Sequence, residues 1–99
     1  MAGVIPYTFK GELWQYAAPG GWYFISMPQE MASEIRNMLK QEEQGWGRLN
    51  AIVVIGKTEW KTAIWFDTKR HTYLLPVKAD VRKSEKLSAG KSYQISIWV

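Results

Sequence analysis

Three cationic side chains recur at intervals of four residues in the segment KADVRKSEK near the end of the chain. If this segment is helical, Lys78, Arg82 and Lys86 share one face and repel one another by roughly 0.2–0.5 kcal/mol per pair. Such a stripe either faces water or binds an anion, and the planar guanidinium of Arg82 can hold a carboxylate or phosphate through two bonds. Two further cations would extend the basic surface, Lys83 and Lys91. The segment therefore predicts a solvated face or a contact for an anion or a nucleic acid.

Three tryptophans fall in the outward phase of predicted strands. Trp14, Trp65 and Trp98 alternate with the residues assigned to the core, so the alternation places them at or near the surface. Exposed aromatic side chains are enriched where proteins bind partners. The alternative is that helices cover this face, since helices pack on sheet faces. These tryptophans and Arg82 are the candidate residues for binding a ligand or partner.

The residues offer little for catalysis. His71 is the single histidine, and it lies at a predicted turn with no carboxylate spaced to orient it as a base. The chain has no cysteine, which excludes disulfides, thiolate metal sites and cysteine nucleophiles. Its carboxylates are scattered, and the PGGW segment lacks the lysine and helix of a phosphate-binding loop. We therefore expect a protein that is not an enzyme, with no cofactor and no metal.

Length and composition indicate one globular domain over residues 1–99. Hydrophobic residues make up 46% of the chain, and they include six tryptophans that can fill a core. The first residues lack the features of a signal peptide, and no apolar stretch reaches membrane-spanning length. The absence of cysteine also argues against a secreted disulfide scaffold. We expect a cytoplasmic protein.

The net charge of +4 is unevenly distributed. Residues 51–99 contain nine Lys and Arg against four Asp and Glu, whereas residues 1–50 contain four against five. A basic half is compatible with a phosphate-bearing partner, although a surplus of lysine also serves solubility.

The pattern of apolar residues predicts six strands, and two further segments have helical patterns. Segment 48–56 is apolar in both phases from Ala51 to Ile55, which predicts a central strand covered on both sides or sealed by a partner. The strands fall at 7–15, 21–27, 48–56, 58–67, 71–77 and 91–99. A long amphipathic helix occupies 28–45, a short one occupies 78–86, and APGG at 18–21 forms a turn. The order ββαβ–ββαβ predicts a mainly β (α+β) fold, a small six-stranded double-split β-barrel capped by one long and one short helix.

The two predicted hairpins align with each other at a shift of 51 residues. This shift lays Phe9, Leu13 and Trp14 over Trp60, Ile64 and Trp65, and it lays Trp22 and Phe24 over Tyr73 and Leu75. Two alternating hairpins also align by chance, so internal duplication and coincidence remain open.

Several motifs carry a resemblance to a known family. They are GKTEWKTAIWF from Gly56, YLLPVKADVRK from Tyr73, SAGKSYQISIWV at the end, and WYFISMP earlier in the chain. The sequence resembles an uncharacterised bacterial domain-of-unknown-function family, often fused to a YdeI/OmpD-associated domain. The resemblance implies a double-split β-barrel similar to the transition-state-regulator and antitoxin DNA-binding barrels, and it implies no activity. The family's usual Gly-Asp pair before the last strand is Gly90-Lys91 here.

Two functional hypotheses follow. The first is a non-enzymatic binding module, which recognises a protein or small ligand through the aromatic residues on the barrel. The second is weak nucleic-acid binding through the basic stripe, for which a homodimer would place two stripes along one duplex. A monomer and a homodimer both remain open.

Overall fold

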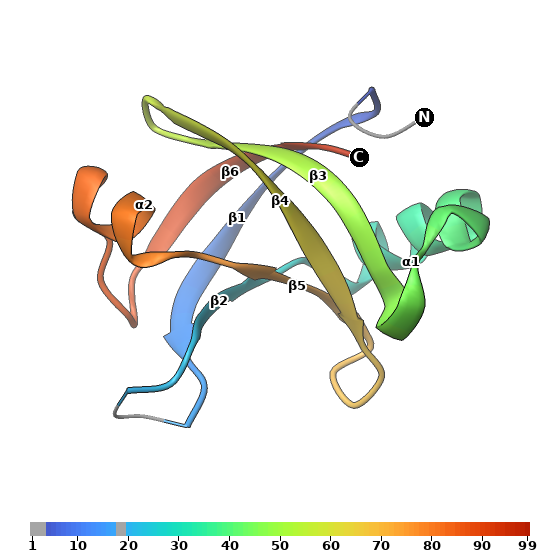
Figure 1. The fold of residues 1–99 in the computed structure, drawn as a ribbon, viewed down its shortest axis with the longest axis horizontal. Coiled ribbons are helices and arrows are strands. Elements are labelled where there is room, and N and C mark those ends of the chain that lie inside the picture. The colour runs from blue at the N-terminus through green and yellow to red at the C-terminus, as the bar shows by residue number, and fades with distance from the viewer. Residues whose placement is uncertain (1–3, 18–19) are drawn as a thin grey trace.

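The computed structural model describes residues 4–17 and 20–99, and their elements follow the predicted ββαβ–ββαβ order (Figure 1). The strands are β1 (Pro6–Gln15), β2 (Tyr23–Ser26), β3 (Arg48–Ile55), β4 (Thr58–Asp67), β5 (Thr72–Pro76) and β6 (Ser92–Trp98). The helices are α1 (Gln29–Leu39) and α2 (Ala79–Ser84), with short 3₁₀ turns at Lys40–Glu42 and Gly45–Gly47. Ala18 and Pro19 of the predicted APGG turn lie outside the described residues.

The strands close into one antiparallel barrel in the order β1-β2-β5-β4-β3-β6. The first and last strands seal it, since β1 pairs with β6 from Pro6 opposite Trp98 to Glu12 opposite Ser92. Closure gives every strand two neighbours, which protects the edges through which sheets aggregate. The predicted fold class is therefore confirmed.

Alternation of buried and more exposed side chains is clearest in β3, whereas β5 buries four consecutive residues, Thr72 to Leu75. In β3 every second residue is buried, because successive side chains of a strand point to opposite faces. On the outer face Ile52 and Val54 are only half-buried, so the described residues do not cover this strand on both sides as its apolar run predicted. The largest fully buried side chains come from five of the six strands and from α1: Tyr73, Leu13, Ile25, Ile35, Ile64, Leu75, Ile95 and Ile97. Each such aliphatic side chain stabilises the fold by roughly 1.5–3 kcal/mol relative to an exposed one.

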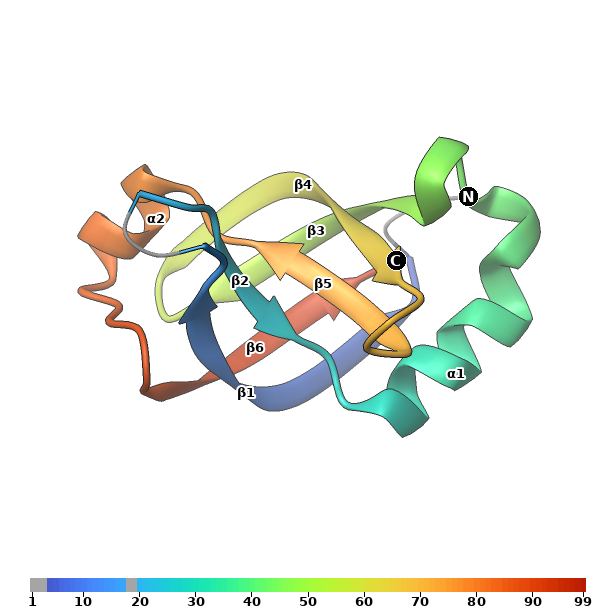
Figure 2. The same cartoon turned by 90° about the horizontal axis from the view of Figure 1, so that it is seen from below.

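The two helices lie at opposite ends of the barrel (Figures 1 and 2). Helix α1 buries Ala32 and Ile35 against one end. It ends at Leu39, so the prediction that it continues to Gly45 is wrong. The chain from position 40 to 44 is entirely polar and has no apolar face to pack against the barrel, so the α-helix does not continue and a 3₁₀ turn at Lys40–Glu42 follows it.

Helix α2 closes the other end and is shorter than predicted. It covers Ala79–Ser84, so Lys78 and Lys86 lie outside it. Val77 and Val81 are buried and anchor the apolar side of this segment to the barrel. The helix ends because Lys86 adopts a left-handed φ of 54° and the amide of Leu87 donates to the carbonyl of Arg82 at 2.8 Å.

Glu85 ties this end of the molecule to the β3–β4 turn. Its carboxylate accepts hydrogen bonds from the Thr58 hydroxyl at 2.6 Å and from the Lys57 backbone amide at 3.3 Å. Gly56, in the same turn, has a φ of 58°, and a Cβ there would lie 2.0 Å from the Glu85 Oε1. The positive φ favours glycine at residue 56, and a Cβ there would displace the Glu85 carboxylate from its position beside the turn.

Neither helix in residues 4–17 and 20–99 has the length and apolar character needed to cross a membrane.

Candidate functional site

A cleft of about 420 Å³ opens at the α2 end of the barrel, and we call it the Trp22 cleft. Strand β4 has ten residues, whereas its neighbour β5 has five, and their described pairing runs only from Trp65 to Asp67 of β4. The first half of β4 thus separates from the chain that leaves β5 toward α2. The cleft occupies this separation, with Trp60, Lys61 and Thr62 on the β4 side.

The opposite wall of the Trp22 cleft comes from β2, the end of β5 and the start of α2. Trp22, just before β2, and Tyr23, its first residue, lie on this wall together with Lys78 and Arg82 of the α2 segment. Trp22 has 70% of its surface exposed, which is unusual for so large an apolar side chain. The cleft therefore combines an accessible indole with cationic side chains.

Charge in the Trp22 cleft is of one sign. Lys61, Lys78 and Arg82 line it, and among the described residues no carboxylate does. Lys61 and Lys78 are exposed. A concave surface that carries several like charges without counter-charges concentrates anions from solution.

Arg82 is held in place as part of the cleft wall. Its Cζ lies 3.7 Å from the centroid of the Tyr23 ring, and its Nε donates to the carbonyl of Val77 at 3.2 Å. These contacts leave the two terminal nitrogens without a hydrogen-bond partner in the described part of the chain. The guanidinium is thus oriented before any ligand arrives, which reduces the entropy lost on binding.

A second, shallower cleft of about 630 Å³ lies on the outer face of β3 and β4, and we call it the Trp65 cleft. Its outward residues include Arg48, Asn50 and Ile52 of β3, with Trp65 of β4 at one end. The two clefts adjoin, because both are lined by Lys61 and Thr62. No described carboxylate lines the second cleft either.

The three tryptophans predicted to face outward are all accessible, but they do not form one patch. Trp65 has 38% of its surface exposed and lines the cleft that bears its name. Trp14 is half-buried on β1, and Trp98 is half-buried on β6, where it pairs with Ile52 and Pro6. Neither Trp14 nor Trp98 lines the Trp22 cleft or the Trp65 cleft.

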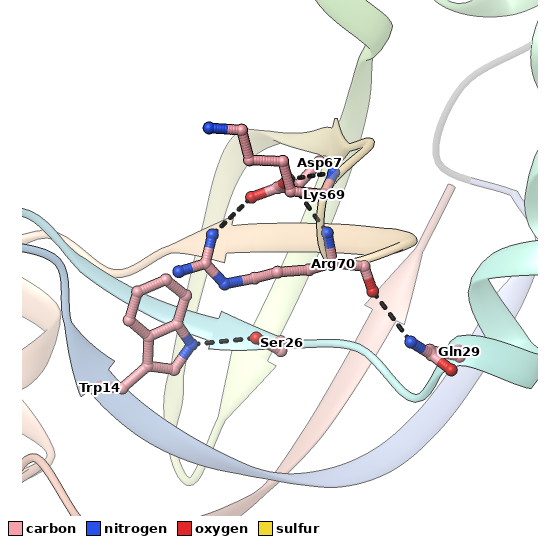
Figure 3. A network of polar contacts seen from close by, with 6 residues as sticks. All are labelled: Trp14, Ser26, Gln29, Asp67, Lys69 and Arg70. Carbon is pink, nitrogen blue, oxygen red and sulfur yellow. Dashed lines mark hydrogen bonds and ion pairs between the residues drawn. The ribbon is translucent and has the colours of Figure 1, made fainter.

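Trp14 is instead part of a polar network that joins three strands (Figure 3). Its indole N–H donates to the Ser26 hydroxyl at 2.9 Å, and the Arg70 Cζ lies 4.6 Å from the centroid of its ring. The Arg70 carbonyl accepts a hydrogen bond from the side-chain amide of Gln29, and this bond links the β4–β5 turn to α1. Trp14 therefore stabilises the barrel wall in this structure.

Asp67 organises the turn that carries Arg70. Its carboxylate accepts hydrogen bonds from the backbone amides of Lys69 and Arg70. It also forms an ion pair with the Arg70 guanidinium at 2.7 Å. Burial alone would raise the pKa of this carboxyl, but the hydrogen bonds and charge of Arg70 hold its pKa below the usual value. His71 follows in the same turn, exposed, with a φ of 55°.

The predicted basic stripe is only partly assembled. Because α2 is limited to Ala79–Ser84, Lys78, Arg82 and Lys86 do not share one helical face. Lys78 and Arg82 both line the Trp22 cleft. The remaining predicted cations are exposed and line neither cleft: Lys83, Lys86 and Lys91.

A second polar cluster lies at the α1 end of the barrel. The hydroxyl of the fully buried Tyr73 donates to Glu43, whose side chain is 7% exposed and pairs with Arg36 at 3.8 Å. The Arg36 Cζ lies 3.7 Å over the Phe66 ring. Burial raises the pKa of Tyr73 well above its usual value, and the Glu43 carboxylate raises it further. This cluster is enclosed and stabilises the fold.

Trp22 is the functional candidate that the sequence interpretation missed. The alignment of the two hairpins at a shift of 51 residues matched Trp22 with Tyr73, which is fully buried. It also matched Phe24, which faces outward, with the buried Leu75. The shift holds in the first strand of each hairpin, where Leu13 and Ile64 are both buried, and fails in the second. Alternation with the buried Ile25 was the signal that could have placed Trp22 outside.

No group of three or more histidine and acidic side chains in residues 4–17 and 20–99 is arranged to hold a metal ion.

Comparison with known proteins identifies the family. Residues 9–97 match the family described as Domain of unknown function (DUF1905). The match covers nearly the whole chain, which therefore belongs to this family, as the motifs in its second half predicted. No curated protein matches the chain.

Proposed function

We propose that this member of the DUF1905 family is a non-catalytic binding module that takes an anionic ligand with a planar ring into the Trp22 cleft. The observation that carries the proposal is the pairing of one accessible indole with three cations in a concave site that no described carboxylate lines. Sites for small ligands are typically concave and largely apolar, with a few convergent polar groups. The volume of the cleft, about 420 Å³, suits a ligand of nucleotide size.

The chemistry of the walls defines the ligand. Trp22 offers an exposed ring face on which a planar group can stack. Lys78 and the free terminal nitrogens of Arg82 can receive a phosphate or carboxylate from the other side. A ligand that spans both walls needs a ring and an anionic group joined by a short linker.

The non-catalytic part of the proposal is supported by the position of the single histidine. His71 lies in the exposed β4–β5 turn and lines neither cleft. We also propose a cytoplasmic location, because a chain without cysteine has none of the disulfides that are typical of small secreted domains.

The test is a titration of the protein with thymidine 5′-monophosphate as probe, with uncharged thymidine as the matched control. Isothermal calorimetry at low salt should show that the nucleotide binds and that thymidine binds at least about tenfold more weakly, a difference of 1.4 kcal/mol. Trp22→Leu should weaken nucleotide binding by about fivefold or more, because it removes the stacking surface. Lys78→Gln should weaken it as well.

Two matched variants control for these changes. Trp98→Leu and Lys10→Gln make the same substitutions at residues that line neither cleft, so both should bind like the original protein. Equal affinities for the nucleotide and thymidine would contradict an anion site. Equal losses in Trp22→Leu and Trp98→Leu would contradict the assignment of the ligand to the Trp22 cleft.

A further inference from the structure

The two clefts meet at β4 and form one continuous basic surface. Lys61 and Thr62 line both, so a ligand that leaves the Trp22 cleft over Lys61 enters the Trp65 cleft without crossing another element. Residues 61 and 65 of β4 point to the same face of the sheet, and they lie about 13 Å apart at the usual rise of a strand. The combined surface is therefore longer than a single small ligand requires.

The same two types of side chain recur along this surface. Its cations are Arg48, Lys61, Lys78 and Arg82, and each cleft contains one exposed tryptophan, Trp22 or Trp65. Described carboxylates line neither cleft. Proteins that bind single-stranded nucleic acid combine a basic groove for the phosphates with aromatic rings on which bases stack.

We propose that the Trp22 and Trp65 clefts together bind a short single-stranded nucleic acid, with one base stacked on each tryptophan and the backbone passing over Lys61. The inference rests on the proposed function, since the Trp22 cleft supplies the first nucleotide site. It replaces the predicted duplex contact of the α2 stripe with a different surface and a different form of nucleic acid. An acidic peptide would satisfy the cations but would leave both indoles without a stacking partner.

The charge of the surface sets the expected salt dependence. If four phosphates are neutralised, the logarithm of the association constant falls against the logarithm of salt concentration with a slope of about −2.8 for a single strand. Removing one of the four cations should bring the slope to about −2.1. Arg48→Gln is the suitable variant, because Arg48 is exposed and lies outside the Trp22 cleft.

The experiment measures fluorescence anisotropy of a labelled ten-nucleotide thymidine strand, with calorimetry of thymidine monophosphate on the same proteins. Trp65→Leu should weaken strand binding by about 5- to 150-fold and leave mononucleotide binding unchanged. Arg48→Gln should reduce the salt slope as stated. Trp98→Leu and Lys10→Gln should change neither quantity, because these residues lie outside both clefts.

The outcomes separate the two proposals. If the protein binds the mononucleotide but binds the strand no more tightly, or if neither Trp65→Leu nor Arg48→Gln affects strand binding, the extended surface is refuted while the Trp22 site stands. Equal binding of a ten-base-pair duplex, or of a deca-glutamate peptide, would also refute it, because stacking on both indoles would contribute nothing. If neither the mononucleotide nor the strand binds, the proposed function itself fails.

Discussion

The guanidinium of Arg82 lies over the ring of Tyr23, with its Cζ 3.7 Å from the ring centroid, although the two residues come from opposite halves of the chain. The same side chain donates from Nε to the Val77 carbonyl. This arrangement joins β2 to α2 and places a fixed cation in the wall of the Trp22 cleft. Arg82 therefore links the stability of the barrel end to the charge of the proposed site.

The first prediction concerns this contact. Arg82→Lys keeps the charge but loses the planar group over Tyr23 and the Nε donor, so the free energy of unfolding should fall by about 1–2 kcal/mol. Urea denaturation measures the change. Lys83→Gln, at an exposed neighbour on α2, should stay within about 0.5 kcal/mol of the original protein. Equal stability of both variants would show that the stacked geometry contributes nothing.

The second prediction concerns the hydrogen bond between Tyr73 and Glu43. Tyr73→Phe leaves the nearly buried Glu43 carboxylate without this donor, and the free energy of unfolding should fall by about 1–3 kcal/mol. Tyr16→Phe removes a hydroxyl from a side chain that is 56% exposed and should have almost no effect. Urea denaturation of both variants makes the comparison, and similar stabilities would contradict the structural role of the cluster.

The third prediction concerns alkaline pH. Tyrosine ionises near pH 10 in an unfolded chain, whereas burial and Glu43 raise the pKa of Tyr73 in the folded protein. The contribution of Tyr73 to stability is thus fully present below about pH 10 and is lost as the pH rises from there toward the folded pKa. Unfolding free energies measured at pH 8 and pH 11 should therefore differ less in Tyr73→Phe than in the original protein. A pH dependence that survives this substitution unchanged would contradict the assignment to Tyr73.

The fourth prediction concerns the β4–β5 turn. Asp67→Asn weakens the acceptor of the Lys69 and Arg70 amides and removes the charge that holds the Arg70 guanidinium. Hydrogen exchange at these two amides should accelerate by about fivefold, which corresponds to a lost hydrogen bond of about 1 kcal/mol. Asp80→Asn, at an exposed position in the first turn of α2, should leave both amides unchanged. Unaltered exchange in Asp67→Asn would show that the turn does not depend on its carboxylate.

The fold could be predicted because its determinants are local. Alternation in segments such as 58–67 reports directly which side chains enter a barrel, and the strand observed there has the same bounds. The helices were less predictable at their ends, since the arrest of α1 at Leu39 depends on where packing against the barrel stops. Patterns of period two identify strands, but they do not determine how far a neighbouring strand continues beside them.

The site could not be predicted in the same way, because it arises from the mismatch between β4 and β5. Where β5 stops pairing, Trp60 and Lys61 line the same cleft as Lys78, and no sequence spacing encodes that proximity. Alternation correctly placed Trp14, Trp65 and Trp98 away from the core. Alternation did not show that Trp14 lies against Arg70, which belongs to the distant β4–β5 turn. The sequence thus predicts on which face of its strand each tryptophan lies. Which residues lie next to one another across the surface depends on how the strands close into the barrel.

The most direct test of the binding proposal is nuclear magnetic resonance of the indole N–H groups, assigned with the Trp22→Leu and Trp98→Leu variants. During titration with thymidine monophosphate, the Trp22 signal should shift, because its exposed ring forms the stacking wall of the cleft. The dissociation constant fitted to this shift should equal the one measured by calorimetry. The Trp98 signal should remain in place, since this residue lies outside both clefts. A stationary Trp22 signal at saturating nucleotide, or equal shifts of the Trp22 and Trp98 signals, would contradict the account.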